Sequence, residues 1–147
     1  MEKKVLATIS STQRVDSESE QVELTTAAVY RSGKFFHEIC YEESQATGLE
    51  GSVTTVRLDG DGTVSVRRSG RTDSLLLIKE GETNLCAYDT GYGQAMLGIT
   101  GTRVHSTLDD GKGALRFLYS LTVDGALLSE NEVSITLKES STDELSC

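Results

Sequence analysis

Strict alternation of apolar and polar residues is the feature that most constrains how this chain can fold. Successive side chains of a β-strand point to opposite faces, so a period of two indicates strands with one buried face. No segment repeats apolar residues at helical spacing for three turns. The stripe with the most regular alternation covers residues 115–123, and others cover residues 5–9, 22–30, 35–41, 54–58, 64–66 and 133–137.

Glycine-rich turns separate these stripes. Pairs such as Gly81-Glu82 and Asp124-Gly125 supply residues that tolerate positive φ, and no proline interrupts strand hydrogen bonding. About ten strands at this spacing form an antiparallel meander, and closing the meander into a barrel removes its exposed edges. We therefore predict an all-β fold, a single antiparallel meander barrel of about 8–10 strands over residues 1–139. Residues 10–20 are predicted to be a polar loop, and residues 140–147 a disordered tail.

Length, charge and cysteine content narrow the class of protein. A chain of 147 residues fits one domain, and its net charge of −9 disfavours nucleic acid as a partner. Cys40, Cys86 and Cys147 lack metal-ligand spacing, and His37 and His105 are two lone histidines, so a structural zinc site is not expected. The sequence shows neither a signal peptide nor an apolar run of about 20 residues. We expect a cytoplasmic protein with no membrane partner, no cofactor and no metal, and a homodimer is left open.

One segment, residues 41–51, breaks the alternation with three carboxylates and two glycines at a strand end. The turn lengths predict that this segment and two other strand ends meet at one mouth of the barrel. Turns at residues 59–62 and 70–71 place Arg68 opposite Val53 on one side and Asp73 on the other. A hairpin around residues 80–83 would set Asp73 near Thr90. The predicted site residues at this mouth are Tyr41, Glu43, Arg68, Asp73, Tyr88 and Thr90.

Arg68 is the most informative of these residues. It continues the stripe of Val64 and Val66, so we expect it to point inward, as Glu43 does after Tyr41. An inward arginine at a barrel mouth could hold the carboxylate or phosphate of a ligand. Alternatively, Arg68 could pair with Glu43 or Asp73 and only fix the closure of the barrel, because a charge facing the interior must be paired. The sequence leaves both interpretations open.

No catalytic motif is visible in the sequence. His37 lies on an aromatic stripe and is predicted to be a core or mouth residue, while His105 lies in a polar strand and is predicted to be solvated. A Ser-His-Asp site is assembled in space and stays open, but nothing resembles a nucleophile elbow or a phosphate loop. We therefore predict a protein without enzymatic activity.

Several motifs give a family resemblance that extends from about Lys3 to Lys138. The chain resembles the bacterial YwiB-like proteins, a family of unknown function with a calycin-like, lipocalin-type β-barrel. The resemblance implies that fold, and it transfers no catalytic residue. The residues that carry it are Tyr41-Glu42-Glu43-Ser44, Thr47-Gly48-Leu49-Glu50-Gly51, Arg68-Ser69-Gly70, Tyr88-Asp89-Thr90 and Tyr92-Gly93.

Two functions from different classes follow. The barrel could bind a small, partly apolar or anionic ligand, or it could be filled by its own side chains and act as a structural or protein-interaction module. An apolar pocket of several hundred Å³ with Arg68 at its rim would favour binding. A packed interior with an apolar patch outside would favour a protein partner.

Overall fold

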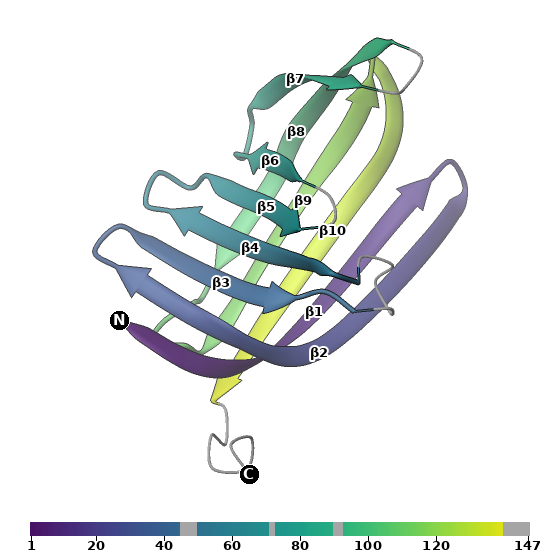
Figure 1. Cartoon of the computed structure of the whole chain (residues 1–147). Helices are drawn as coiled ribbons and strands as arrows, with labels where there is room; N and C mark the ends of the chain where they lie inside the picture. Colours follow the sequence, from purple (N-terminus) through teal and green to yellow (C-terminus); the bar gives the residue numbers. More distant parts are fainter. Residues whose placement is uncertain (45–49, 71–72, 90–92, 140–147) are drawn as a thin grey trace.

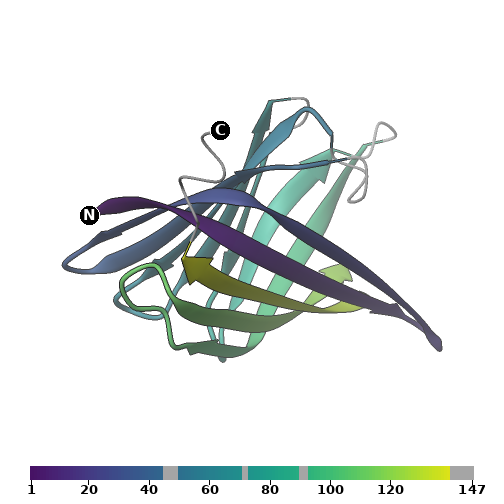
Figure 2. The same cartoon turned by 90° about the horizontal axis from the view of Figure 1, so that it is seen from below.

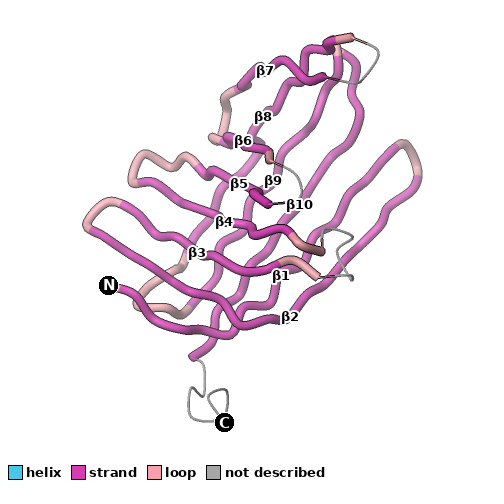
Figure 3. The backbone as a smooth tube through the Cα atoms, in the orientation of Figure 1, coloured by secondary structure: helices cyan, strands magenta, loops and turns pink. Residues whose placement is uncertain are grey.

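The computed structural model describes residues 1–44, 50–70, 73–89 and 93–139, with residues 86–89 described by their backbone alone. These residues form ten strands and, as Figure 3 shows, no helix. Accordingly, the described part contains no helix with the length and apolar character of a membrane span. The strands are β1 (Glu2–Val15), β2 (Glu18–Gly33), β3 (Phe36–Glu42), β4 (Ser52–Asp59), β5 (Val64–Gly70), β6 (Ser74–Ile78), β7 (Thr83–Asp89), β8 (Gln94–Ser106), β9 (Gly113–Val123) and β10 (Ala126–Glu139).

All ten strands belong to one sheet, in the order β6-β5-β4-β3-β2-β1-β10-β9-β8-β7. Every paired neighbour is antiparallel, including β1 and β10, which join the two halves of the chain. Figures 1 and 2 show the sheet curving over, so that β3, β4 and β5 lie across the interior from β8, β9 and β10. The predicted all-β antiparallel meander is therefore confirmed, as one nearly closed barrel.

The short segment that follows edge strand β6 closes the barrel by hydrogen-bonding to β8, and the two edge strands β6 and β7 do not pair with each other. After β6, the amide of Gly81 donates to the carbonyl of Gly101 on β8 at 2.9 Å, and the amide of Gly101 donates to Glu82 at 3.0 Å. A side chain at position 101 would clash with the carbonyl of Lys79, so glycine permits this close approach. The predicted hairpin that pairs β6 with β7 is wrong, because these strands lie at opposite ends of the sheet order.

The predicted loop over residues 10–20 is also wrong. Strands β1 and β2 continue through it as a long hairpin with a turn at Asp16, whose φ is 55°. Thr12 still pairs with Gln21 on β2 and with Glu132 on β10. Residues 13–20 of this hairpin are exposed on both faces. Because neither face is buried, apolar residues are not required at every second position, and the alternation that would predict strands is lost.

The core fills the barrel with the inward faces of its strands. Tyr30, Phe117 and Ile135 are at most 1% exposed, and the apolar residues buried with them come from the predicted stripes as well as from Ile78 and Ile99. Because side chains alternate along each strand, these buried positions also fix which polar residues point inward near the strand ends. Two of these polar residues, Thr54 and Glu43, are buried.

Candidate ligand site

Three neighbouring strands place a row of inward side chains near one end of the barrel. Tyr41 of β3 lies opposite Thr54 of β4, and Thr54 lies opposite Arg68 of β5. Tyr41 and Thr54 are buried and Arg68 is half-buried, whereas Arg67 is exposed on the other face. The predicted inward direction of Arg68 is thus confirmed, but its predicted partners are wrong. It faces Thr54 and Ser74, not Val53 and Asp73.

Glu43 joins this row from the segment that follows β3. Its amide donates to the carbonyl of Ser52 at 2.9 Å, which agrees with the predicted position beside β4. Its side chain is only 8% exposed, and the hydroxyl of Thr54 donates to Glu43 Oε1 at 3.0 Å. Thr54 is therefore in contact with Glu43 through its hydroxyl and beside Arg68 through the strand pairing.

Two glycines let the strands come together behind Glu43. Gly51 has a φ of 90° and Gly70 a φ of 115°. A Cβ at Gly70 would lie 2.7 Å from the carbonyl oxygen of Gly51, so a side chain there would separate the two chain segments. Gly51 belongs to the segment that breaks the alternation, and its conformation explains one of the two glycines there. The other, Gly48, lies outside the described residues.

Arg68 lacks the ion pair that the structural interpretation requires. Its Nε atom is buried and has no hydrogen-bond partner within the described residues. No carboxylate of the described part lies within the 4.0 Å of its guanidinium that an ion pair needs, so the pairs with Glu43 and Asp73 are not formed. Asp73 is exposed and lines an open hollow of about 470 Å³ with Arg67, Arg68 and Ser74.

Two tyrosine hydroxyls lie in the field of these charged groups. Burial raises the pKa of Tyr41, and the negative charge of Glu43 raises it further, while the positive charge of Arg68 acts in the opposite direction. Burial also raises the pKa of Tyr119, again against the charge of Arg68. Both phenols are consequently protonated donors at neutral pH. Tyr119 belongs to β9, so Arg68 acts on residues from both sides of the barrel.

A cavity of about 150 Å³ lies between these residues. Its polar lining consists of Ser11, Tyr41, Glu43, Arg68 and Tyr119. This volume is smaller than the several hundred Å³ that would favour ligand binding, but it is about the size of a cavity that accepts benzene. The apolar lining comes from Ile9, Val22, Leu24, Val56, Val66, Leu76, Phe117 and Val133.

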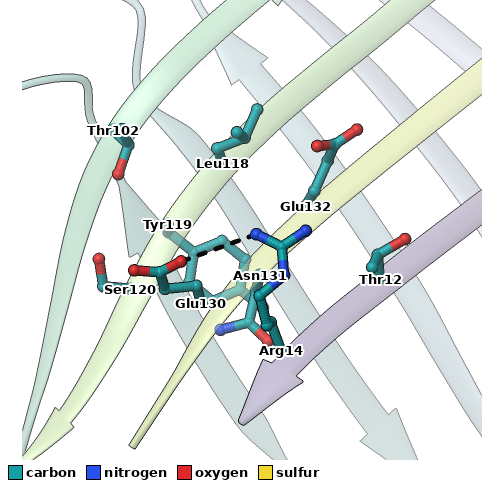
Figure 4. Close-up of a pocket in the computed structure, with 9 residues that line it drawn as sticks. All are labelled: Thr12, Arg14, Thr102, Leu118, Tyr119, Ser120, Glu130, Asn131 and Glu132. Carbon is teal, nitrogen blue, oxygen red and sulfur yellow. Dashed lines mark ion pairs between the residues drawn. The ribbon is translucent and has the colours of Figure 1, made fainter. Parts of the chain in front are cut away.

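A second hollow of about 180 Å³ lies on the outer face across β1, β8, β9 and β10 (Figure 4). Figure 4 shows Arg14 and Glu130 pointing toward each other, and their ion pair measures 3.9 Å. Glu132 is paired with Arg116 at 3.1 Å. These charged groups are exposed to solvent and already paired with one another, so they can contribute little binding energy to a ligand. The interior cavity is therefore the better candidate site.

The remaining candidates lie elsewhere or outside the described part. The hydroxyl of Tyr30 contacts Nδ1 of His37 at 2.6 Å in the wall of a hollow at the opposite barrel end, and His105 is exposed. Among the residues that the structure describes, no three His, Cys, Asp or Glu side chains gather to hold a metal ion. The side chain of Tyr88, and all of Thr90, lie outside the described residues.

Sequence reasoning missed two residues of this site: Tyr119, which lines the cavity, and Thr54, which holds Glu43 beside it. Tyr119 follows Phe117 on the longest apolar stripe, so its inward direction was readable from the alternation. Its place beside Arg68 was not, because the two residues belong to β9 and β5 and meet only across the closed barrel. Thr54 also lies on an inward stripe, but the register error assigned Val53 to its place.

Comparisons with known proteins identify relatives by sequence and by fold. The sequence profile described as "Domain of unknown function (DUF1934)" matches residues 7–135. No curated protein matches the chain significantly. Among solved structures, the crystal structure of the YwiB protein from Bacillus subtilis matches with a TM-score of 0.78 and 21% identity, over 95% of this chain and 94% of that one. The structural match supports the calycin-like barrel predicted from the family resemblance.

Proposed function

We propose that this chain, which belongs to the DUF1934 family of domains of unknown function, is a binding protein whose barrel holds one small anionic ligand through Arg68. The observation that carries the proposal is the buried Nε of Arg68, which has no hydrogen-bond partner among the described residues and lines an interior cavity. A guanidinium cannot lose its proton in a protein, so it needs an acceptor. A ligand oxygen would supply one.

The energetic cost of the empty site supports this proposal. Leaving a buried polar group without a partner costs about 1–3 kcal/mol, and more when the group is charged. A carboxylate or phosphate can accept two parallel hydrogen bonds from the guanidinium fork. The protonated hydroxyl of Tyr119 would add a donor beside the same group. Binding would therefore offset a cost that the ligand-free protein carries.

The apolar lining limits the rest of the ligand. Val56, Val66 and Phe117 belong to the wall of the cavity, which has a volume of about 150 Å³. An apolar group of about six heavy atoms, the size of benzene, fits such a volume. We infer a ligand with one anionic group at Arg68 and a short apolar part against this wall. A long acyl chain does not fit.

Thermal-shift and calorimetric titrations with short-chain carboxylates test the proposal. Wild-type protein should bind 4-methylpentanoate, and a ligand at 100 times its Kd should stabilise it by about 2.7 kcal/mol. Arg68→Leu should abolish binding. Arg67→Leu is the matched control, because Arg67 precedes Arg68 on the same strand but is exposed. Equal binding by wild type and Arg68→Leu, or none by either, would overturn the proposal.

A protein-interaction module is the second candidate, supported by apolar side chains outside the barrel. Leu85, Gly98, Thr122 and Leu127 form one row across β7, β8, β9 and β10. Leu85 and Leu127, at the two ends of this row, are 67% and 62% exposed. Light scattering tests whether a second copy covers the row. A dimer that Leu85→Ser converts to a monomer would favour this function over ligand binding.

A further inference from the structure

We propose that the ligand is a zwitterion, an α-amino acid with a short aliphatic side chain, whose carboxylate meets Arg68 and whose ammonium meets Glu43. This inference rests on the proposed function and adds a second contact to it. It follows from a feature that a simple anion site does not need. The same small cavity contains a carboxylate of the protein as well as its guanidinium.

The two charged groups share the cavity without neutralising each other. Glu43 and Arg68 both line it, yet no ion pair within 4.0 Å joins them. Interactions between charges are strong in a partly buried cavity. A carboxylate beside Arg68 would repel a simple anion and weaken its binding, so a site for a simple anion gains nothing from Glu43. Two separated opposite charges instead complement a ligand that carries both signs.

Thr54 is a neighbour of both groups. It faces Arg68 across the β4–β5 pairing, and its hydroxyl donates to Glu43 Oε1 at 3.0 Å. The charges of Glu43 and Arg68 also both act on the hydroxyl of Tyr41, so both lie near it. The ammonium and carboxylate of an α-amino acid are bonded to the same carbon, which suits two charged groups that line one cavity of about 150 Å³.

Glu43 has capacity for the ammonium group. A carboxylate can accept about four hydrogen bonds, and the side chain of Glu43 accepts from the hydroxyls of Thr54 and Tyr41, so it keeps room for further donors. At 8% exposure, its remaining lone pairs have little access to bulk water. A buried carboxylate of this kind is stabilised by a cation with several donors. An ammonium group has three N–H donors.

The apolar wall of the cavity limits the size and polarity of the amino-acid side chain that can bind. An isobutyl group is smaller than benzene and fits a cavity of about 150 Å³. An indole is larger than benzene and does not fit beside the charged end groups. Valine, leucine and isoleucine are therefore the expected ligands, and tryptophan is excluded by size. Lysine and glutamate are excluded because the wall would bury a further charge.

The test compares three probes that share one branched carbon chain: L-leucine, 4-methylpentanoate without the ammonium group, and 3-methylbutylamine without the carboxylate. Isothermal titration of wild-type protein should give at least tenfold tighter binding of L-leucine than of either analogue. Glu43→Gln should remove this preference and leave 4-methylpentanoate bound. Glu42→Gln, the exposed neighbour on the other face, is the matched control and should bind as wild type does.

The outcomes separate this inference from the proposed function. If 4-methylpentanoate binds as tightly as L-leucine and requires Arg68, the zwitterion is wrong and the anion site stands. If none of the three probes binds wild-type protein, both are wrong. The comparison among probes uses wild-type protein, so it decides the matter even if Glu43→Gln fails to fold.

Discussion

Thr54 lies opposite Arg68 in the β4–β5 pairing, but its hydroxyl donates to Glu43 Oε1 instead, at 3.0 Å. Thr54 is 1% exposed and Glu43 is 8% exposed, so this hydrogen bond is shielded from water. It orients the carboxylate within the cavity, while the buried Nε of Arg68 has no hydrogen-bond partner among the described residues. The candidate site depends on this arrangement.

Replacing the hydroxyl of Thr54 should destabilise the fold. Thr54→Val keeps the shape of the side chain but removes a donor to Glu43 and leaves Tyr41 bonded to it, and losing a hydrogen bond to a buried charged group costs about 1–3 kcal/mol. Urea denaturation at pH 7 measures this loss. Thr55→Val is the control, because Thr55 is on the other face and donates only to the sulfur of Cys40. A loss at Thr54 no greater than at Thr55 would show that the hydrogen bond contributes nothing.

Removing the guanidinium of Arg68 should not destabilise the ligand-free protein. If Arg68 closed the barrel through a buried ion pair, Arg68→Leu would cost about 3 kcal/mol or more. Because no such pair is formed, we expect the free energy of unfolding to stay within about 1 kcal/mol of wild type or to rise. The measurement is a urea melt of protein freed of ligand by refolding. A loss of about 3 kcal/mol would restore the structural interpretation of Arg68.

The glycine at position 51 should resist substitution through its backbone conformation. Its φ of 90° is unfavourable for a β-branched residue, so Gly51→Val should cost about 1–3 kcal/mol. Asparagine tolerates positive φ better, and Gly51→Asn should cost less than Gly51→Val. Denaturant melts of the two variants give the comparison. Equal and negligible losses would mean that the backbone there can relax.

The closure of the barrel should depend on Gly101. A methyl group there would meet the carbonyl of Lys79, so Gly101→Ala should cost about 1–3 kcal/mol and weaken the segment that bridges β6 to β8. Hydrogen exchange at the amide of Gly81, which donates to Gly101, should become faster. Gly60→Ala is the control, because its nearest contact is 3.4 Å away. Unchanged exchange at Gly81 would contradict this description of the closure.

Tyr41 should make the protein less stable at alkaline pH. Its pKa is raised above the ordinary 10.0, chiefly by burial and then by the charge of Glu43. Above pH 10 the unfolded chain loses a proton that the folded chain keeps, so the free energy of unfolding falls as the pH rises. Tyr41→Phe removes this term, and its stability should fall less steeply above pH 10. A tyrosinate absorbance change near pH 10 that is lost in Tyr41→Phe would show an unshifted tyrosine.

The sequence predicted the fold and the faces of the strands well, because both follow from the period of two. Arg68 and Glu43 point inward as predicted, since each continues an inward stripe. Register depends on single residues within turns, and there the prediction failed. The β4–β5 turn closes with the amide of Asp59 on the carbonyl of Thr63, one residue later than assumed, which puts Thr54 instead of Val53 opposite Arg68.

Other features of the site could not be read from the sequence. The bridge from Gly81 to Gly101 joins two positions 20 residues apart. No pattern within a strand records such a contact. The approach of Arg68 to Tyr119 is likewise a consequence of barrel closure, and the absence of its ion pair depends on side-chain geometry that alternation does not determine.

The most direct test of the central claim observes the Nε–H group of Arg68 itself. In an ¹⁵N-edited NMR spectrum, this resonance can be assigned by its loss in Arg68→Leu. Titration of wild-type protein with 4-methylpentanoate should shift it progressively to saturation, because the ligand oxygen becomes its hydrogen-bond acceptor, while the resonance of Arg67 stays in place. A ligand that binds without moving the Arg68 resonance, or a spectrum that no carboxylate changes, would contradict the claim that Arg68 is the anion-binding residue of this barrel.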